Sequence, residues 1–140
     1  MSEGAGNAEI ILVRKDGALI LQHRDDKPGI TNPGFVSTFG GHIEEGEDPL
    51  DAAFREIHEE TNLVLDSTTF EFFGKYHKTK EVHGEDWDVY YYVVRNVDDT
   101  NLEVYEGQGF KIVKNHEDLS KEKMTLLAAE VLGDYFKANS

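Results

Sequence analysis

The chain has 140 residues, and its 28 Asp and Glu against 14 Lys and Arg give a formal net charge of −14 at pH 7 with the histidines neutral. Hydrophobic residues make up 39%, which excludes a disordered acidic tail, and the lack of cysteine excludes a thiolate metal site or a thiol nucleophile. The acidic balance disfavours a nucleic-acid duplex or an anionic membrane as partner. No apolar run is long enough to span a membrane. The length predicts a single domain over residues 1–140, and the lack of cysteine suits a reducing cytoplasm.

The N-terminal part of the chain predicts a β-hairpin followed by a long loop. Residues 8–14 form an apolar, β-branched run, Asp16-Gly17 is a hairpin-turn dipeptide, and residues 18–23 supply the returning strand. Residues 24–34 contain two of the three prolines. A loop of this length inside a compact domain is more often functional than idle, so we expect it to border a site.

The clearest helix signal follows a short predicted strand at 35–39 and a predicted turn at Gly40-Gly41. Asp48 is placed to cap the free N–H groups, and Pro49 suits the first helical position. The helix is expected to end near Thr61. Apolar residues recur at helical spacing along one stripe: Leu50, Ala53, Phe54 and Ile57.

The second half of the chain predicts mostly strands and one closing helix. The expected strands are 63–65, 70–77, 87–95, 102–105 and 110–113, with residues 78–86 as a loop. The closing helix presents a stripe of Met124, Leu127, Ala128, Val131, Leu132 and Tyr135. This order predicts a mixed sheet with helices packed on it. An exposed strand edge at 87–94 would suit a homodimer.

Acidic residues gather in one stretch. Between Glu44 and Glu60 lie eight acids and a single base, Arg55. On a helix, Glu56, Glu59 and Glu60 fall in one sector beside the apolar stripe, where they repel one another unless a cation neutralises them. Mg²⁺ prefers carboxylate oxygens and keeps places for substrate phosphates, so we expect a magnesium site here. The alternative is a solvated helix face.

The stretch from Gly41 to Leu63 resembles the Nudix box G-x5-E-x7-R-E-U-x-E-E-x-G-U, where U is a bulky aliphatic residue. It reads Gly41, Glu47 and then Arg55-Glu56-Ile57-His58-Glu59-Glu60-Thr61-Asn62-Leu63. The only departure is Asn62 in place of the last glycine. We expect Asn62 to adopt the left-handed conformation that ends the helix, since asparagine tolerates it.

The resemblance implies the fold and chemistry of a MutT-like Nudix hydrolase. The fold would be α/β, a Nudix-type α/β/α sandwich with a central mixed β-sheet, and the cofactor Mg²⁺ or Mn²⁺. The implied metal ligands are Glu56, Glu59, Glu60 and the backbone carbonyl of Gly40. Glu47 would support them, and Arg55 would orient a glutamate by a charge-assisted hydrogen bond.

A second resemblance lies far from the box. Glu106-Gly107-Gln108 is similar to the E-G-Q of MutT-type enzymes, whose glutamate joins the metal site or acts as the base. In some relatives the base sits in the loop that matches 78–86, where Glu81 and Glu85 are candidates. The base therefore stays open among Glu106, these two residues and a box glutamate.

Three residues are candidates for binding a nucleotide. Arg24 matches a nucleotide-contacting arginine of MutT-type enzymes, Phe35 is placed to line a base pocket or the core, and Lys123 lies where those enzymes use a base-reading asparagine. Markers of several Nudix subfamilies are absent. We therefore expect a (d)NTP or an oxidised dNTP such as 8-oxo-dGTP as substrate, cleaved to NMP and pyrophosphate. The alternatives are a nucleotide-sugar or other NDP-X hydrolase, and a non-catalytic nucleotide sensor.

Overall fold

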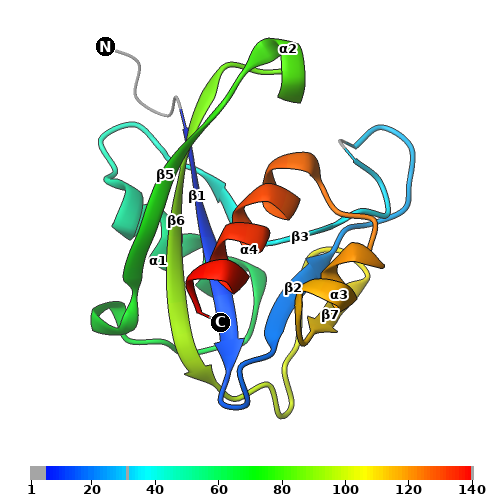
Figure 1. The fold of residues 1–140 in the computed structure, drawn as a ribbon. Helices are drawn as coiled ribbons and strands as arrows, with labels where there is room; N and C mark the ends of the chain where they lie inside the picture. Colours follow the sequence, from blue (N-terminus) through cyan, green and yellow to red (C-terminus); the bar gives the residue numbers. More distant parts are fainter. Residues whose placement is uncertain (1–5, 31, 140) are drawn as a thin grey trace.

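The computed structural model describes residues 6–30 and 32–139. The described residues form one seven-stranded mixed sheet, ordered β3-β2-β1-β6-β5, with β4 paired to β1 and β7 to β2 (Figure 1). The strands are β1 (Gly6–Arg14), β2 (Leu19–His23), β3 (Val36–Ser37), β4 (Phe39–His42), β5 (Glu71–Lys78), β6 (Trp87–Val97) and β7 (Gly109–Val113). The helices are α1 (Pro49–Glu60), the 3-10 turn η1 (Ser67–Thr69), α2 (Lys80–His83), α3 (His116–Ser120) and α4 (Leu126–Ala138).

Alternating side chains of β1 divide the core into two layers. Ala8, Ile10 and Leu12 are buried in the layer that contains the apolar residues of α1, whereas Ile11 and Val13 belong to the layer that contains α4. Figure 1 shows α4 crossing one face of the sheet and α1 behind the opposite face. The expected α/β/α sandwich with a central mixed sheet is therefore confirmed.

The hairpin and the closing helix form as the sequence predicts. β1 and β2 pair antiparallel, and Gly17 in the connecting turn has φ +90°. Five residues of the predicted stripe are buried on α4: Leu127, Ala128, Val131, Leu132 and Tyr135. Met124 lies just before the helix, where it forms a bridge with Val36 of β3.

The segment from β3 to β4 fills the space where β1 and β2 diverge. β3 pairs with the end of β2, and β4 pairs with residues 7–10 of β1, so Thr38 is the residue at which the backbone passes from one strand to the other. The predicted turn at Gly40-Gly41 is wrong, because both glycines lie within β4. They are needed for space: a Cβ at Gly40 would overlap the carbonyl oxygen of Ala8, and one at Gly41 would overlap the carboxylate of Glu56.

Helix α1 begins and ends where predicted, but Asn62 does not have the predicted conformation. The side chain of Asp48 accepts from the backbone N–H of Asp51 at 2.9 Å, and Pro49 is the first helical residue. At the other end Thr61 is extended, and Asn62 is not left-handed. The Asn62 side chain instead holds the 101–103 segment: it donates to the Asn101 carbonyl at 2.9 Å and accepts from the Glu103 N–H at 2.8 Å.

Two predicted strands, 63–65 and 102–105, are not strands. Besides the contacts of the Asn62 side chain, the backbone pairing between these parts of the chain is limited to an isolated bridge between Thr61 and Val104, and no continuous β-ladder forms. The predicted loop 78–86 contains the single turn of α2, and α3 was not predicted.

The strand edge proposed for a dimer is also wrong. β6 pairs with β1 on one side and β5 on the other, so residues 87–94 have no free edge. The hairpin of β5 and β6 extends beyond the rest of the sheet and carries α2 at its tip (Figure 1). No helix in the described part of the chain is both long and apolar enough to cross a membrane.

The contacts of Asn62 lead to a prediction that separates the two descriptions of the end of α1. If Asn62 were left-handed, its replacement by glycine would stabilise the protein. In the observed conformation, Asn62→Gly removes two hydrogen bonds and should lower the free energy of unfolding by about 1 kcal/mol. Urea denaturation measures this difference. Val64→Ala is the control, because the Val64 side chain is 92% exposed and its truncation should change little. An Asn62→Gly variant at least as stable as the parent would contradict the described contacts.

Candidate active site

Arg55 organises the outer part of the acidic cluster. Its Nε and Nη2 donate to the two carboxylate oxygens of Glu47 at 2.8 and 2.9 Å, and Nη2 also donates to the His42 carbonyl at 3.0 Å. Its Nη1 donates to Glu56 at 3.1 Å and to Glu59 at 3.2 Å. The hydrogen bonds from Arg55 lower the pKa of Glu47, and Arg55 thereby ties the loop before α1 to the helix face.

The inner part of the cluster is buried. Glu60 is 4% exposed and accepts from the backbone N–H of Gly40 at 3.0 Å. Burial, together with the charges of Glu9 and Glu56, raises the pKa of Glu60 to about 9. Burial also raises the pKa of Glu56, although Arg55 partly offsets it. Glu59 differs, because its side chain is 56% exposed and contacts Arg55.

Glu9 of β1 is a member of the site that the sequence reasoning missed. It is buried, opposes Gly40 in the β1–β4 ladder, and accepts from the Thr38 hydroxyl at 2.5 Å. Burial raises the pKa of Glu9 to about 7. A signal for it existed, because Glu9 is the one acid in the run from Ala8 to Val13.

The structure places Glu106 on the same side as the box acids. Its charge contributes to raising the pKa of both Glu56 and Glu60, after burial and closer charges. The turn that carries it is fixed to the end of β2, where the Gln108 N–H donates to the His23 carbonyl at 2.7 Å. Of the other candidate bases, Glu85 pairs with Lys78 at 3.2 Å, and Glu81 lies in α2 at the tip of the hairpin.

The three predicted nucleotide-binding residues lie together. The backbone N–H of Arg24 donates to the Phe35 carbonyl at 2.9 Å, and the Lys123 ammonium lies 4.5 Å from the centre of the Phe35 ring. The side chain of Gln108 donates to the Arg24 carbonyl at 2.8 Å. The E-G-Q turn therefore connects this group to the acids, and Lys123 and Phe35 form one surface.

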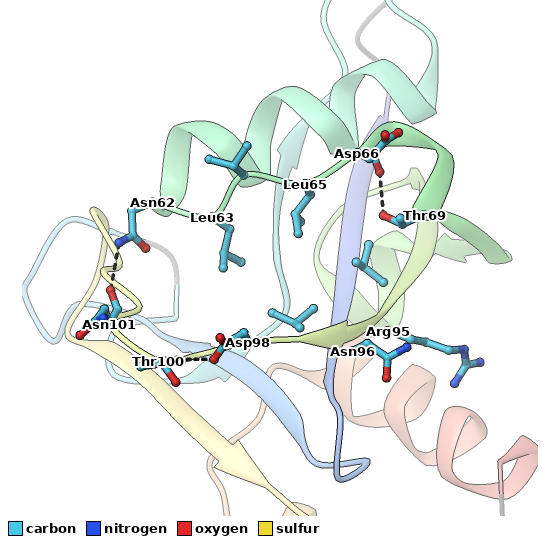
Figure 2. Close-up of a pocket in the computed structure, with 13 residues that line it drawn as sticks. Asn62, Leu63, Leu65, Asp66, Thr69, Arg95, Asn96, Asp98, Thr100 and Asn101 are labelled. Atoms are coloured by element: carbon cyan, nitrogen blue, oxygen red, sulfur yellow. Dashed lines mark hydrogen bonds between the residues drawn. The ribbon is translucent and has the colours of Figure 1, made fainter.

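A separate cleft of about 590 Å³ lies elsewhere, between the segment after α1 and the end of β6 (Figure 2). Leu63 and Leu65 line one side, and Asn96 and Asp98 line the other. None of the candidate catalytic or nucleotide-binding residues lines this cleft. We therefore place the site at the acids and not at this cleft.

The acidic residues fit a hard divalent cation in their chemistry. They offer carboxylate oxygens, and the described residues show no ion pair from Lys, Arg or His to Glu9 or Glu60. Within residues 6–30 and 32–139, no three acidic or imidazole side chains converge into a ready-made cage. Repulsion between unneutralised carboxylates and the attachment of Glu59 to Arg55 explain this spread.

The NUDIX domain profile matches residues 5–132 of the chain. The chain belongs to the NUDIX family. The resemblance stated from the box is thereby confirmed, as is the enzyme class, a Nudix hydrolase.

Solved structures share the fold at low sequence identity. A MutT NUDIX hydrolase from Burkholderia pseudomallei has a TM-score of 0.76 at 19% identity, covering 94% of this chain and 98% of its own. A MutT/nudix family protein from Enterococcus faecalis has a TM-score of 0.74 at 16% identity, covering 94% of this chain and 60% of its own. A bifunctional NMN adenylyltransferase/ADP ribose pyrophosphatase from Francisella tularensis, complexed with AMP and a Mn ion, has a TM-score of 0.76 at 13% identity, covering all of this chain and 43% of its own.

The raised pKa of Glu60 predicts how stability depends on pH in EDTA. The folded protein keeps this proton up to pH about 9, whereas the unfolded chain releases it near 4.5, so stability falls as pH rises through this interval. Glu60→Gln should make the stability depend less on pH and should raise the melting temperature at pH 8 by roughly 5 °C. Differential scanning calorimetry at pH 5 to 9 measures it, and an unchanged slope in the variant would contradict the assignment.

Proposed function

We propose that the chain is a divalent-cation-dependent pyrophosphohydrolase acting on nucleoside triphosphates or related nucleoside diphosphate derivatives. The observation that carries the proposal is the group of acids around α1, of which Glu9 and Glu60 are buried and form no ion pair among the described residues. Buried acids with raised pKa values concentrate at functional sites. Family membership gives this cluster a reaction class, the cleavage of a diphosphate bridge.

The proposed cofactor is Mg²⁺, with Mn²⁺ as a substitute. Glu56, Glu59, Glu60 and the Gly40 carbonyl would hold it, and Glu106 would join them or act as base. When bound, such a cation neutralises phosphate charge and activates water for attack at phosphorus. The Mn ion in the Francisella tularensis structure supports this choice.

The residues of this chain have distinct tasks in that reaction. Arg55 keeps Glu56 and Glu59 oriented through its hydrogen bonds, which reduces the reorganisation needed when phosphate arrives. Of the three candidate bases outside the box, Glu106 is favoured, because its charge acts on Glu56 and Glu60. Glu81 and Glu85 are the weaker alternatives.

The substrate side is proposed to consist of Arg24, Phe35 and Lys123. Phe35 offers an aromatic face for a base, and the two cations offer attraction to phosphate, which a chain of net charge −14 supplies at few places. A lysine cannot provide the paired donor and acceptor of an amide. We therefore propose a broad (d)NTP substrate range, which includes 8-oxo-dGTP, with nucleotide sugars as the alternative. A single domain over residues 1–140 and a cytoplasmic location belong to the same proposal.

Substitution of the box acids tests the proposed reaction. Glu59→Gln and Glu60→Gln should each lower kcat by about a hundredfold or more, because each removes a charged oxygen from the cation site. The measurement is the release of nucleoside monophosphate, followed by chromatography, from a panel of canonical and oxidised (d)NTPs, nucleotide sugars and dinucleotides, with Mg²⁺. Glu117→Gln, an exposed acid of α3, is the control for a lost charge.

Two results would contradict the proposal. Turnover unchanged in both variants would show that the box acids do not act in catalysis. Saturable nucleotide binding by the parent protein without hydrolysis of any panel member would instead favour the non-catalytic sensor.

Lys123 is expected to act on binding more than on chemistry. Lys123→Met keeps much of the contact with Phe35 but removes the charge, so KM should rise by roughly tenfold with kcat changed little. Steady-state kinetics on the best panel substrate measure this. Lys121→Met is the matched control, because Lys121 is an exposed lysine two residues away. Equal KM values for the two variants would remove Lys123 from the site.

A further inference from the structure

Glu9 occupies a place in the fold that an amide or a hydroxyl would fill at lower cost. It lies in β1 between completely buried apolar neighbours, Ala8 and Ile10, and is itself 9% exposed. An ionised carboxylate is more expensive to bury than a neutral polar group of the same size. A purely structural role would not require the acid.

The contacts of Glu9 hold one oxygen firmly and the other weakly. Oε1 accepts from the Thr38 hydroxyl at 2.5 Å, whereas Oε2 has only a 3.4 Å contact with the Asn7 amide. The Asn7 side chain is itself fixed by the Trp87 indole N–H at 2.7 Å. The carboxylate is thereby oriented, and Oε2 keeps capacity for another partner.

That second oxygen lies beside a residue of the proposed cation site. Gly40 opposes Glu9 in the ladder, and a Cβ at Gly40 would lie 2.5 Å from Oε2. Gly40 also donates its N–H to Glu60 at 3.0 Å. Because Gly40 has no side chain, Glu9 of β1 can approach the part of the site that β4 and α1 form.

The charge of Glu9 acts on the inner acids. It is the largest charge contribution at Glu60, and Glu56 in turn acts on Glu9. The repulsion acts mainly on Glu60, because at Glu9 the charge of Lys78 has a larger effect than that of Glu56. A shared cation turns this repulsion into attraction.

We propose that Glu9 belongs to the divalent-cation site, to which it contributes a strand-borne carboxylate through Oε2 beside Gly40 and Glu60. This inference rests on the proposed function, because it assigns a further residue to the same cation. The pattern of the box does not contain it, since Glu9 lies 32 residues before Gly41.

Mn²⁺ binding without substrate tests the inference with a readout other than activity. The full chain is titrated with Mn²⁺ at pH 8, and free Mn²⁺ is followed by electron paramagnetic resonance. Glu9→Gln keeps the shape and one acceptor oxygen for the Thr38 hydroxyl but removes the charge, so we expect the Kd for Mn²⁺ to rise at least about tenfold. Glu71→Gln, an exposed acid of β5, should leave the Kd unchanged.

Two further variants separate a cation role from a structural one. Glu9→Gln should melt no lower than the parent in EDTA, because it removes a buried charge. Thr38→Val should weaken Mn²⁺ binding in the same direction, because it releases Oε1 while keeping the charge. An unchanged Kd in Glu9→Gln, or a melting temperature below the parent in EDTA, would overturn the inference.

Failure of the proposed function gives a different result. If the parent binds no Mn²⁺, or if Glu60→Gln binds it as tightly as the parent, the cation site itself is wrong. If Glu60→Gln loses binding while Glu9→Gln keeps it, only the role of Glu9 is wrong.

Discussion

The structure depends on carboxylates held between α1 and the sheet, where water cannot solvate them. Glu60 is nearly completely buried and receives a single backbone N–H, while the charges of Glu9 and Glu56 act on it. Burial and the two charges raise the pKa of Glu60 and disfavour its ionised form, and the hydrogen bond from the Gly40 N–H offsets only part of this. The apolar residues of α1 pack well enough to impose this position on Glu60, which shares the helix face with Ile57.

Arg55 divides the acids into two groups with opposite electrostatics. The outer group is paired, and the pKa of Glu47 is lowered by its two hydrogen bonds to the guanidinium. The pKa values of the inner group, Glu9, Glu56 and Glu60, are raised. Among these three, Arg55 donates a hydrogen bond to Glu56 alone. One base therefore fixes the loop and the helix while the buried acid Glu60 forms no ion pair with it. An arginine is suited to this because its planar fork serves several oxygens at once.

The parts of the fold that sequence predicts are those set by local chemistry. The start of α1 follows from Asp48 and Pro49, because a cap and a first-turn proline act within a few residues. The Asp16-Gly17 hairpin has the same local origin. The predicted conformation of Asn62 was wrong because its side chain bonds to Asn101 and Glu103, which are distant in sequence.

The candidate site shows the same limit. The box acids could be found from spacing, since one helix carries them. Gly40 was assigned to a turn because its real constraint, the carboxylate of Glu9 across the ladder, belongs to another strand. Glu9 itself was missed because a single acid in an apolar run forms no repeating pattern from which a role could be predicted. Which strands flank β6 is likewise a matter of topology, and no local pattern of residues 87–94 records it.

The passage of the chain through Thr38 restricts how this protein can diverge. The residues before Thr38 form β3, which follows Phe35, and those after it carry Gly40 against β1. Side chains alternate along a strand, so inserting or deleting one residue here would exchange Gly40 with Phe39 across the sheet. The length of this connection is therefore fixed for as long as the acids are to stay aligned.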